Sequence, residues 1–287
     1  MSSAPALAPA TTPSPTMPGW LRAGFEVLLV LALWVVYSLA RLLADTDMGP
    51  AVDRAHELLQ FEQGLGIHWE VPLNQLFSDY QVIGLAGSYW YASLHYVVTV
   101  AVLVWLWRLG ADRYGPARRA LVIGTLIGLA CYISLPTAPP RFISGYVDVL
   151  KLHAADGWWG ADASAPRGLG GLTNELAAFP SLHAGWALWV ALALQLYATR
   201  HWVRVLGWVY AVGTTVVIVG TGNHWVVDAV AGWLAILAGW AAARAIGRIP
   251  LSRLWPDRLR DRLRPDPIPA ARRVDARPAV REDTVPD

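Results

Sequence analysis

Cysteine, lysine and charged residues are scarce in this chain of 287 residues. Cys131 is the only cysteine, which excludes an intramolecular disulfide and any metal cluster built on cysteine. Charged residues make up only 15% of the chain and hydrophobic residues 55%, a balance too apolar for an ordinary soluble domain. Several apolar runs reach the length that crosses a bilayer, so the sequence predicts an integral membrane protein.

Both ends of the chain lack the bulky apolar residues that a folded segment needs. Residues 1–18 contain Ala, Pro, Ser and Thr with no charged side chain and no apolar core, so we expect a disordered cytoplasmic lead and no secretory leader. Residues 249–287 are rich in Arg, Asp and Pro and are predicted to be a basic cytoplasmic tail. The predicted membrane domain therefore occupies residues 19–248.

The fold class predicted for this domain is an all-α bundle of six membrane-spanning helices. Residues 45–80 are polar but repeat apolar side chains at helical spacing, which predicts one or two short helices along the membrane surface. The six predicted spans cover residues 21–44, 82–107, 117–135, 181–197, 205–219 and 224–243.

The second span carries a polar stripe formed by Ser88, Tyr91, His95 and Thr99, which share one helical face. We expect this stripe to point into the bundle. A histidine within a membrane is costly unless it is paired, so His95 either hydrogen-bonds a neighbouring helix or lines a reaction cavity, together with Tyr91.

The third span is followed by a second polar position, Arg141. Gly124 and Gly128 stand four residues apart, a pattern that favours close helix packing. Three prolines then break the helix just before Arg141, which the sequence predicts at the membrane surface. The long loop that follows, residues 142–178, has the length of a functional loop.

Two predicted helix starts each carry a histidine. Ser181 can cap one helix, which puts His183 in its first turn. Asn223 can cap another, which His224 would open, with Asp228 one turn further along the same face. We interpret these two starts as halves of one site.

The charge distribution predicts the orientation of the chain. The loops after the second and fourth spans and the tail are rich in Arg, while most carboxylates lie in the other loops. The positive-inside rule therefore predicts cytoplasmic termini. Arg141, His183 and His224 then share the extracytoplasmic side of the cell membrane, which favours a common site.

Two histidines, an aspartate and an arginine near two helix N-termini form a good environment for a phosphate. His224 can attack phosphorus while Asp228 fixes its tautomer, His183 can protonate the leaving oxygen, and Arg141 can neutralise the phosphate. Two alternatives stay open: these residues could bind zinc or iron, or they could only hydrogen-bond loops together.

The segment from Phe179 to His183, together with His224 and Asp228, resembles the type 2 phosphatidic acid phosphatase (PAP2) superfamily. Its Ser-Leu-His version resembles the branch related to inositol phosphorylceramide synthase. The resemblance implies a phosphohistidine on His224, oriented by Asp228, with His183 as the acid and Arg141 as a phosphate ligand. Because a nearby Arg and two positive helix ends would repel a cation, we expect no metal, and we expect no cofactor.

Three positions depart from the pattern of this superfamily. No lysine precedes Arg141, Leu182 stands where glycine is usual, and Ile218 stands where an arginine is usual. We therefore expect phosphate binding to depend on Arg141 and on backbone N–H groups. Further candidates for the same site are Ser181, Thr221, Asn223 and His95.

The leading functional hypothesis is a membrane enzyme that takes phosphate or a phospho-headgroup from a lipid. Water as acceptor would make it a phosphatase, and an alcohol such as inositol a phosphotransferase, with the long loop able to bind that alcohol. The alternatives from other classes are a lipid transporter without covalent catalysis and an inactive scaffold. The expected partners are the bilayer and the phosphorylated lipid, with no nucleic acid.

Overall fold

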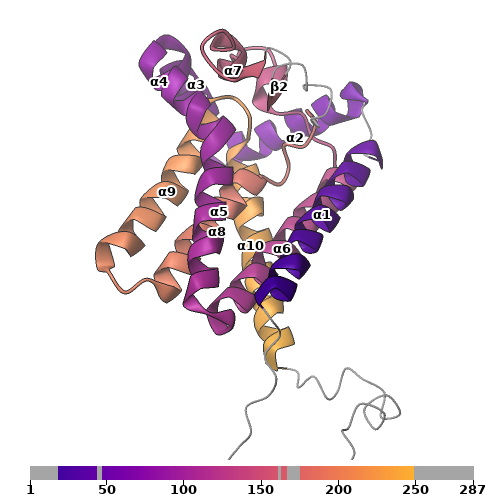
Figure 1. Ribbon diagram of the computed structural model, residues 1–287. Coiled ribbons are helices and arrows are strands. Elements are labelled where there is room, and N and C mark those ends of the chain that lie inside the picture. The colour runs from indigo at the N-terminus through magenta and orange to yellow at the C-terminus, as the bar shows by residue number, and fades with distance from the viewer. Residues whose placement is uncertain (1–18, 44–46, 161–162, 167–174, 249–287) are drawn as a thin grey trace, which may run out of the picture. The chain divides into compact units, whose positions relative to one another are not determined.

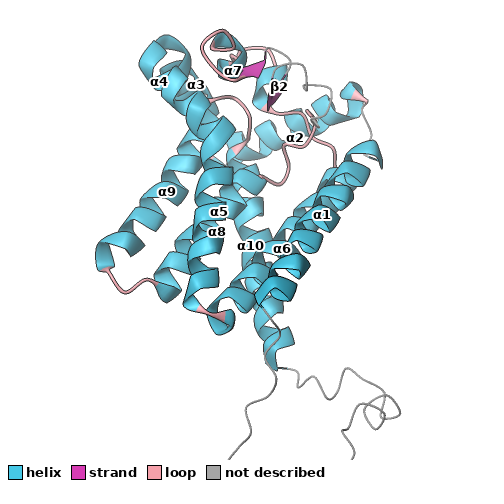
Figure 2. Ribbon diagram, viewed as in Figure 1, coloured by secondary structure: helices cyan, strands magenta, loops and turns pink. Residues whose placement is uncertain are grey.

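The computed structural model describes residues 19–43, 47–160, 163–166 and 175–248. The predicted lead and tail lie outside these residues. The described chain is almost wholly helical, as predicted, with one short antiparallel pair of strands (Figure 2). The longer helices are α1 (Gly19–Leu43), α2 (Met48–Leu65), α5 (His95–Leu109), α6 (Ala111–Ser134), α8 (Leu182–Tyr197), α9 (His201–Gly220) and α10 (Val226–Arg248). The shorter elements are α3 (Glu70–Asp79), α4 (Gln81–Tyr89), η1 (Trp90–Leu94), η2 (Pro140–Phe142), α7 (Val149–Leu152), β1 (Trp159–Gly160) and β2 (Ala163–Pro166).

Four stretches of the described chain are long and apolar enough to cross a membrane. They match the second, third, fifth and sixth predicted spans. Helix α8 is apolar but has only 16 residues, a length of about 24 Å, which is shorter than the ~30 Å hydrocarbon layer. Within α1, Gly24–Leu33 forms a shorter apolar stretch of the described residues, so the six-span count stays a prediction. The four stretches are Gln81–Leu109, Ala111–Ser134, His201–Gly220 and Val226–Gly247.

The second predicted span contains a π-helical turn, η1, between α4 and α5. Such turns widen a helix by one residue and are frequent at functional sites. Within and just after it, Tyr91 and His95 are buried, and the His95 Nδ1–H donates to the Tyr91 carbonyl over 3.0 Å. Ser88 and Thr99 are buried as well, so the prediction that this stripe points inward is confirmed.

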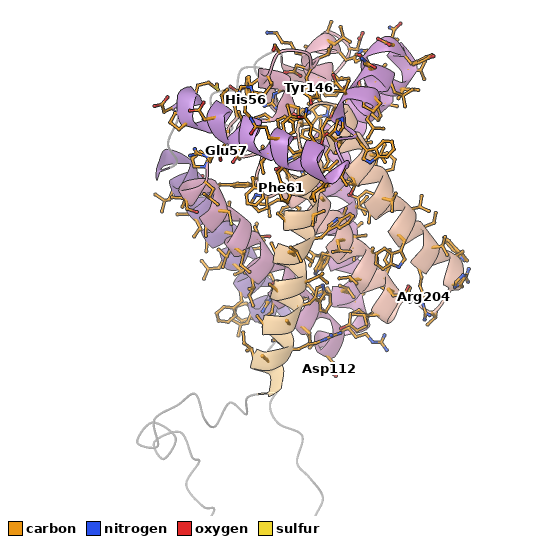
Figure 3. All side chains as sticks on the ribbon, turned by 180° about the vertical axis from the view of Figure 1, so that it is seen from behind. His56, Glu57, Phe61, Asp112, Tyr146 and Arg204 are labelled. Carbon is orange, nitrogen blue, oxygen red and sulfur yellow. The ribbon has the colours of Figure 1, made fainter. Side chains whose placement is uncertain are left out.

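Helices α2 and α3 occupy the stretch where sequence periodicity predicts one or two short helices. Asp47 caps α2 by accepting the Gly49 N–H over 3.0 Å, and Gly66 ends it in the left-handed conformation, with φ 68°. Helix α2 crosses one end of the long helices (Figure 1). Figure 3 shows Glu57 on α2 at this end, whereas Arg204 lies at the opposite end.

The loop between α6 and α8 is tied to the helices beneath it by Asn74 of α3. The amide of Asn74 donates to the carbonyls of Val147 and Gly220, over 2.9 and 3.0 Å, and its oxygen accepts the Val147 N–H over 2.8 Å. These bonds hold the loop against the end of α9. The same docking buries His153 against Gly84 of α4. The sequence predicts a surface position for this histidine, because no motif surrounds it, and the docking of the loop makes that prediction wrong.

Close backbone packing joins α8 and α10. A Cβ atom on Gly232 would stand 2.0 Å from the Ser181 carbonyl oxygen, so only glycine allows this approach. At the same contact, the Ser181 N–H donates to the carbonyl of Asp228 over 2.8 Å. Gly128 of α6 makes room for the Leu182 side chain, so the prediction that it serves packing is confirmed.

Candidate active site

The segment from Thr221 to Trp225 links α9 to α10 and carries His224. Its backbone turns sharply because the Asn223 and His224 N–H groups both donate to the Ile218 carbonyl, over 3.2 and 3.1 Å. Trp225 is fully buried and donates its indole N–H to the Ala138 carbonyl over 3.0 Å. These contacts anchor His224 from both sides.

Helix α10 begins at Val226, two residues later than the sequence predicts. The expected cap, Asn223, accepts a hydrogen bond from Arg141 instead. Asp228 serves the helix start, since its Oδ2 accepts the Trp225 N–H over 2.8 Å. His224 therefore lies in a fixed loop just before the helix, and Asp228 lies inside its first turn.

The hydrogen bonds of His224 determine which ring nitrogen carries its proton. Nδ1 lies 2.9 Å from the Ala178 carbonyl oxygen and 3.5 Å from Oδ2 of Asp228. A carbonyl oxygen only accepts, so Nδ1 is the protonated nitrogen. Nε2 is left with a lone pair, and this buried atom has no hydrogen-bond partner among the described residues. A neutral imidazole in this state can act as a nucleophile through Nε2.

The start of α8 brings the second histidine to the first. Ser181 caps this helix, as predicted, by accepting the Ala184 N–H over 3.3 Å. His183 follows in the first turn, and the centres of the His183 and His224 rings lie 5.6 Å apart. The two helix starts therefore converge, in agreement with the interpretation that they form one site.

Tyr91 and His95 of the polar stripe complete this cluster of rings. The Tyr91 ring stacks on His183 with 4.3 Å between ring centres, and His95 meets the same ring edge-on at 4.2 Å. The Tyr132 hydroxyl donates to the Pro180 carbonyl over 2.9 Å and holds the chain just before Ser181. His183 is thereby enclosed by α5 on one side.

Arg141 is attached to the His224 segment by side chain and backbone. Its Nη1 donates to Oδ1 of Asn223 over 2.5 Å, and its backbone N–H donates to the Gly222 carbonyl over 2.9 Å. Asn223 in turn donates to Oγ1 of Thr221 over 3.0 Å. The Nε of Arg141 lies 3.5 Å from Oδ2 of Asp148. Thr221 and Asn223 thus hold the guanidinium against the segment that carries His224.

The backbone N–H groups at the two helix starts differ in their partners. The amides of Leu182 and His183 at the start of α8 have no acceptor within the described chain. At the start of α10, the N–H groups of Val226 and Val227 are accepted by the carboxylates of Glu70 and Glu62, over 2.8 and 2.7 Å. Within the described chain, only the start of α8 therefore offers free N–H donors to a phosphate. We expected the starts of both helices to offer them.

Sequence reasoning missed three contributors to this site. The Ala178 carbonyl holds His224, yet a backbone carbonyl has no sequence signature. Glu62 and Glu70 are fully buried acidic residues in a segment that reads as surface helices. For Glu62 the only signal is its position on the α2 face that bears Ala51 and Ala55, both buried. Glu70, the first residue of α3, shares a face with the buried Asn74 and Phe77. The described residues contain no cluster of three or more His, Cys, Asp or Glu side chains that could hold a metal ion.

Comparison with protein-family models identifies the family to which this chain belongs. The family model described as the PAP2 superfamily matches residues 56–242. The chain belongs to the PAP2 superfamily. The match starts within α2, well before Phe179, where the motifs that carry the sequence resemblance begin. It includes every candidate site residue as well as Glu62 and Glu70. Comparisons with curated proteins and with solved structures give no match.

Members of the PAP2 superfamily are generally phosphoric ester hydrolases or phosphotransferases. Membership therefore supports phosphatase or phosphotransferase activity for this chain, and its apolar helices fit a multi-pass membrane protein. In this PAP2 protein, the two histidines that carry the resemblance have ring centres that lie 5.6 Å apart.

Proposed function

We propose that this PAP2 protein is a membrane enzyme that transfers the phosphate or phospho-headgroup of a lipid through a phosphohistidine on His224. The observation that carries the proposal is the state of the His224 ring. Its Nδ1–H is held by the Ala178 carbonyl at 2.9 Å, while Nε2 is buried and unpartnered among the described residues. That nitrogen has the lone pair that attack on phosphorus requires.

In the first step, Nε2 of His224 attacks phosphorus, a nitrogen–phosphorus bond forms, and the phosphorus–oxygen bond to the lipid breaks. His183 donates a proton to the departing oxygen. Asp228 and the Ala178 carbonyl stabilise the positive charge that develops on the His224 ring. Arg141 and the free N–H groups of Leu182 and His183 neutralise the non-bridging oxygens.

In the second step, an acceptor hydroxyl attacks the phosphohistidine and gives its proton to His183. The nitrogen–phosphorus bond breaks, and His224 returns to its neutral form. Water as acceptor releases phosphate or a phospho-headgroup. An alcohol such as inositol receives the group from His224 in place of water, so that a phosphate gives a phosphomonoester and a phospho-headgroup gives a phosphodiester. The resemblance of the Ser-Leu-His motif to the inositol phosphorylceramide synthase branch supports such a transfer, and the long loop between α6 and α8 is where we expect the alcohol to bind.

We place this reaction at the extracytoplasmic face of the plasma membrane, with both termini in the cytoplasm. The Arg-rich turns support this orientation. Arg204 lies at the end of the long helices away from α2 (Figure 3), while the site lies at the end that α2 and α3 cover. By the positive-inside rule, the end with Arg204 faces the cytoplasm.

Turnover of a labelled phospholipid by purified protein tests the proposal. His224→Ala and His183→Ala should each abolish turnover, while His68→Ala, which alters an exposed histidine, should keep it. Adding inositol distinguishes the acceptors, because a labelled phosphate ester of inositol forms only in a transferase. Full turnover by His224→Ala would overturn the proposal, and lipid movement that persists in that variant would point to a transporter.

A further inference from the structure

Two buried carboxylates outside the catalytic cluster hold the first turn of α10. Glu62 comes from α2 and Glu70 from α3, and both side chains have 0% exposure. Oε1 of Glu62 accepts the Val227 N–H over 2.7 Å, and Oε1 of Glu70 accepts the Val226 N–H over 2.8 Å. Together with Asp228, which accepts the Trp225 N–H, they occupy three consecutive amides of one turn.

The second oxygen of each of these glutamates lacks a donor. Oε2 of Glu62 and Oε2 of Glu70 are buried, and neither has a hydrogen-bond partner among the described residues. A buried carboxylate without a donor is costly, and two adjacent carboxylates cannot both stay charged. One proton shared between them supplies the missing hydrogen bond and removes one of the two charges.

Burial is the main reason that Glu62 holds this proton. Burial, the hydrogen bond with Glu70 and the charges of Glu70 and Asp228 raise the pKa of Glu62 to about 9, against a smaller opposing effect of the Val227 N–H. Burial and the charges of Glu70 and Glu62 raise the pKa of Tyr146 to about 12. The titratable groups that face Glu62 are therefore its partner Glu70 from α3 and Asp228 from α10, and Tyr146 from the loop faces both glutamates.

The turn that these carboxylates hold sets the geometry of the catalytic cluster. His224 lies two residues before Val226, and Asp228 lies one residue after Val227. The carbonyl of Asp228 also accepts the Ser181 N–H over 2.8 Å, which fixes the start of α8. A displacement of this turn would therefore change the spacing of His224 from both Asp228 and His183.

We propose that Glu62 and Glu70 are positioning residues, a carboxylate pair that holds the first turn of α10 so that His224 and Asp228 keep their reactive geometry. This inference rests on the proposed function for its catalytic consequence. Neither glutamate touches the substrate. Loss of the shared proton adds a second negative charge beside Asp228, pushes the pair apart and loosens the turn, so catalysis falls as the pH rises through about 9.

Substitutions at Glu62 test this role. Gln keeps an oxygen for the Val227 N–H and an N–H group for Glu70 but cannot lose a proton, whereas Leu removes the acceptor. We expect Glu62→Leu to lower kcat by about ten- to a hundredfold with little change in KM, since misplacement by about 1 Å has this effect. Glu62→Gln should keep kcat near the wild-type value at pH 7 and keep its activity above pH 9. Glu57→Gln, on the exposed face of α2, is the matched control.

Two results would overturn the inference: a wild-type kcat in Glu62→Leu, or a pH profile of Glu62→Gln that superimposes on the wild-type profile. If Glu62→Leu does not fold, the profile of Glu62→Gln alone decides. Amide hydrogen exchange at residues 225–227 supplies a readout that needs no turnover. At pH 10, the wild-type amides should exchange faster than those of Glu62→Gln, and equal rates would contradict the role. Absence of turnover in the wild type would instead refute the proposed function.

Discussion

Replacement of Gly232 by alanine tests whether the contact between α8 and α10 sets the site. The new Cβ atom would stand 2.0 Å from the Ser181 carbonyl oxygen, 3.0 Å from its carbonyl carbon and 3.3 Å from the Gly185 nitrogen. All three atoms belong to the backbone, so no rotation of a side chain relieves the clash. Ordinary contact begins at 3.4 Å, so the two helices must separate by about 1.4 Å, the difference between 3.4 and 2.0 Å.

This separation acts directly on catalysis. Ser181 caps α8 two residues before His183, and its N–H donates to the Asp228 carbonyl over 2.8 Å. Moving this point shifts His183 away from His224. A misplacement of about 1 Å costs about 100-fold in rate, and overpacking costs about 1–3 kcal/mol in stability. We therefore expect Gly232→Ala to lose at least about 100-fold in kcat.

The assay is lipid turnover in detergent, together with thermal unfolding of the same preparation. Gly24→Ala is the control, because a Cβ atom on Gly24 in α1 meets nothing within 4 Å. That variant should keep the wild-type kcat. A Gly232→Ala protein with wild-type kcat and unfolding temperature would refute the reasoning that this backbone contact positions His183.

Three further predictions concern the surroundings of the site. Asn74→Leu leaves the Val147 N–H and two carbonyls without their partner, so it should destabilise the protein by about 1–3 kcal/mol or more, measured by thermal unfolding. Arg141→Lys should raise KM for the phospholipid in steady-state assays, because a lysine cannot both bond Asn223 and face a phosphate. The raised pKa of Glu62 means that the folded state holds a proton that the unfolded chain releases near its ordinary value of 4.5. The free energy of unfolding should therefore fall as the pH rises from 4.5 through 9, measured by denaturation across this range, and a constant value would contradict the raised pKa.

The parts of the fold that follow from local sequence were predictable. Long apolar runs predicted the helices, the hydroxyl of Ser181 predicted the start of α8, and helical spacing predicted the inward stripe that includes His95. These signals act within a few residues of one another. The approach of His183 to His224 could also be predicted, because both follow helix-breaking segments at the same expected side of the bundle.

The contacts that complete the site connect segments far apart in the chain. Glu70 and Val226 are 156 residues apart, and Glu62 and Val227 are 165 residues apart. A polar, acidic stretch such as residues 45–80 favours a solvent-exposed interpretation, and only the tertiary structure shows that two of its carboxylates are buried. The late start of α10 has a similar cause, because Asp228 accepts the Trp225 N–H and Asn223 accepts from Arg141 instead.

The unusual leucine in the Ser-Leu-His motif, Leu182, has a packing explanation. Leu182 stands where the PAP2 superfamily usually has glycine, and its side chain lies against Gly128 of α6, where a Cβ atom would meet it at 2.6 Å. The large residue on α8 and the small one on α6 are thus complementary. Leu182 therefore contributes to helix packing beside His183, the proposed acid.

Trapping of the phosphorylated enzyme tests the central proposal most directly. Purified protein is incubated with a phospholipid labelled at phosphorus, quenched under conditions that preserve phosphohistidine, and mapped by mass spectrometry. We expect the label on His224, in wild type and in His68→Ala, and none in His224→Ala. Steady turnover with no labelled histidine, or with the label on another residue, would contradict covalent catalysis by His224.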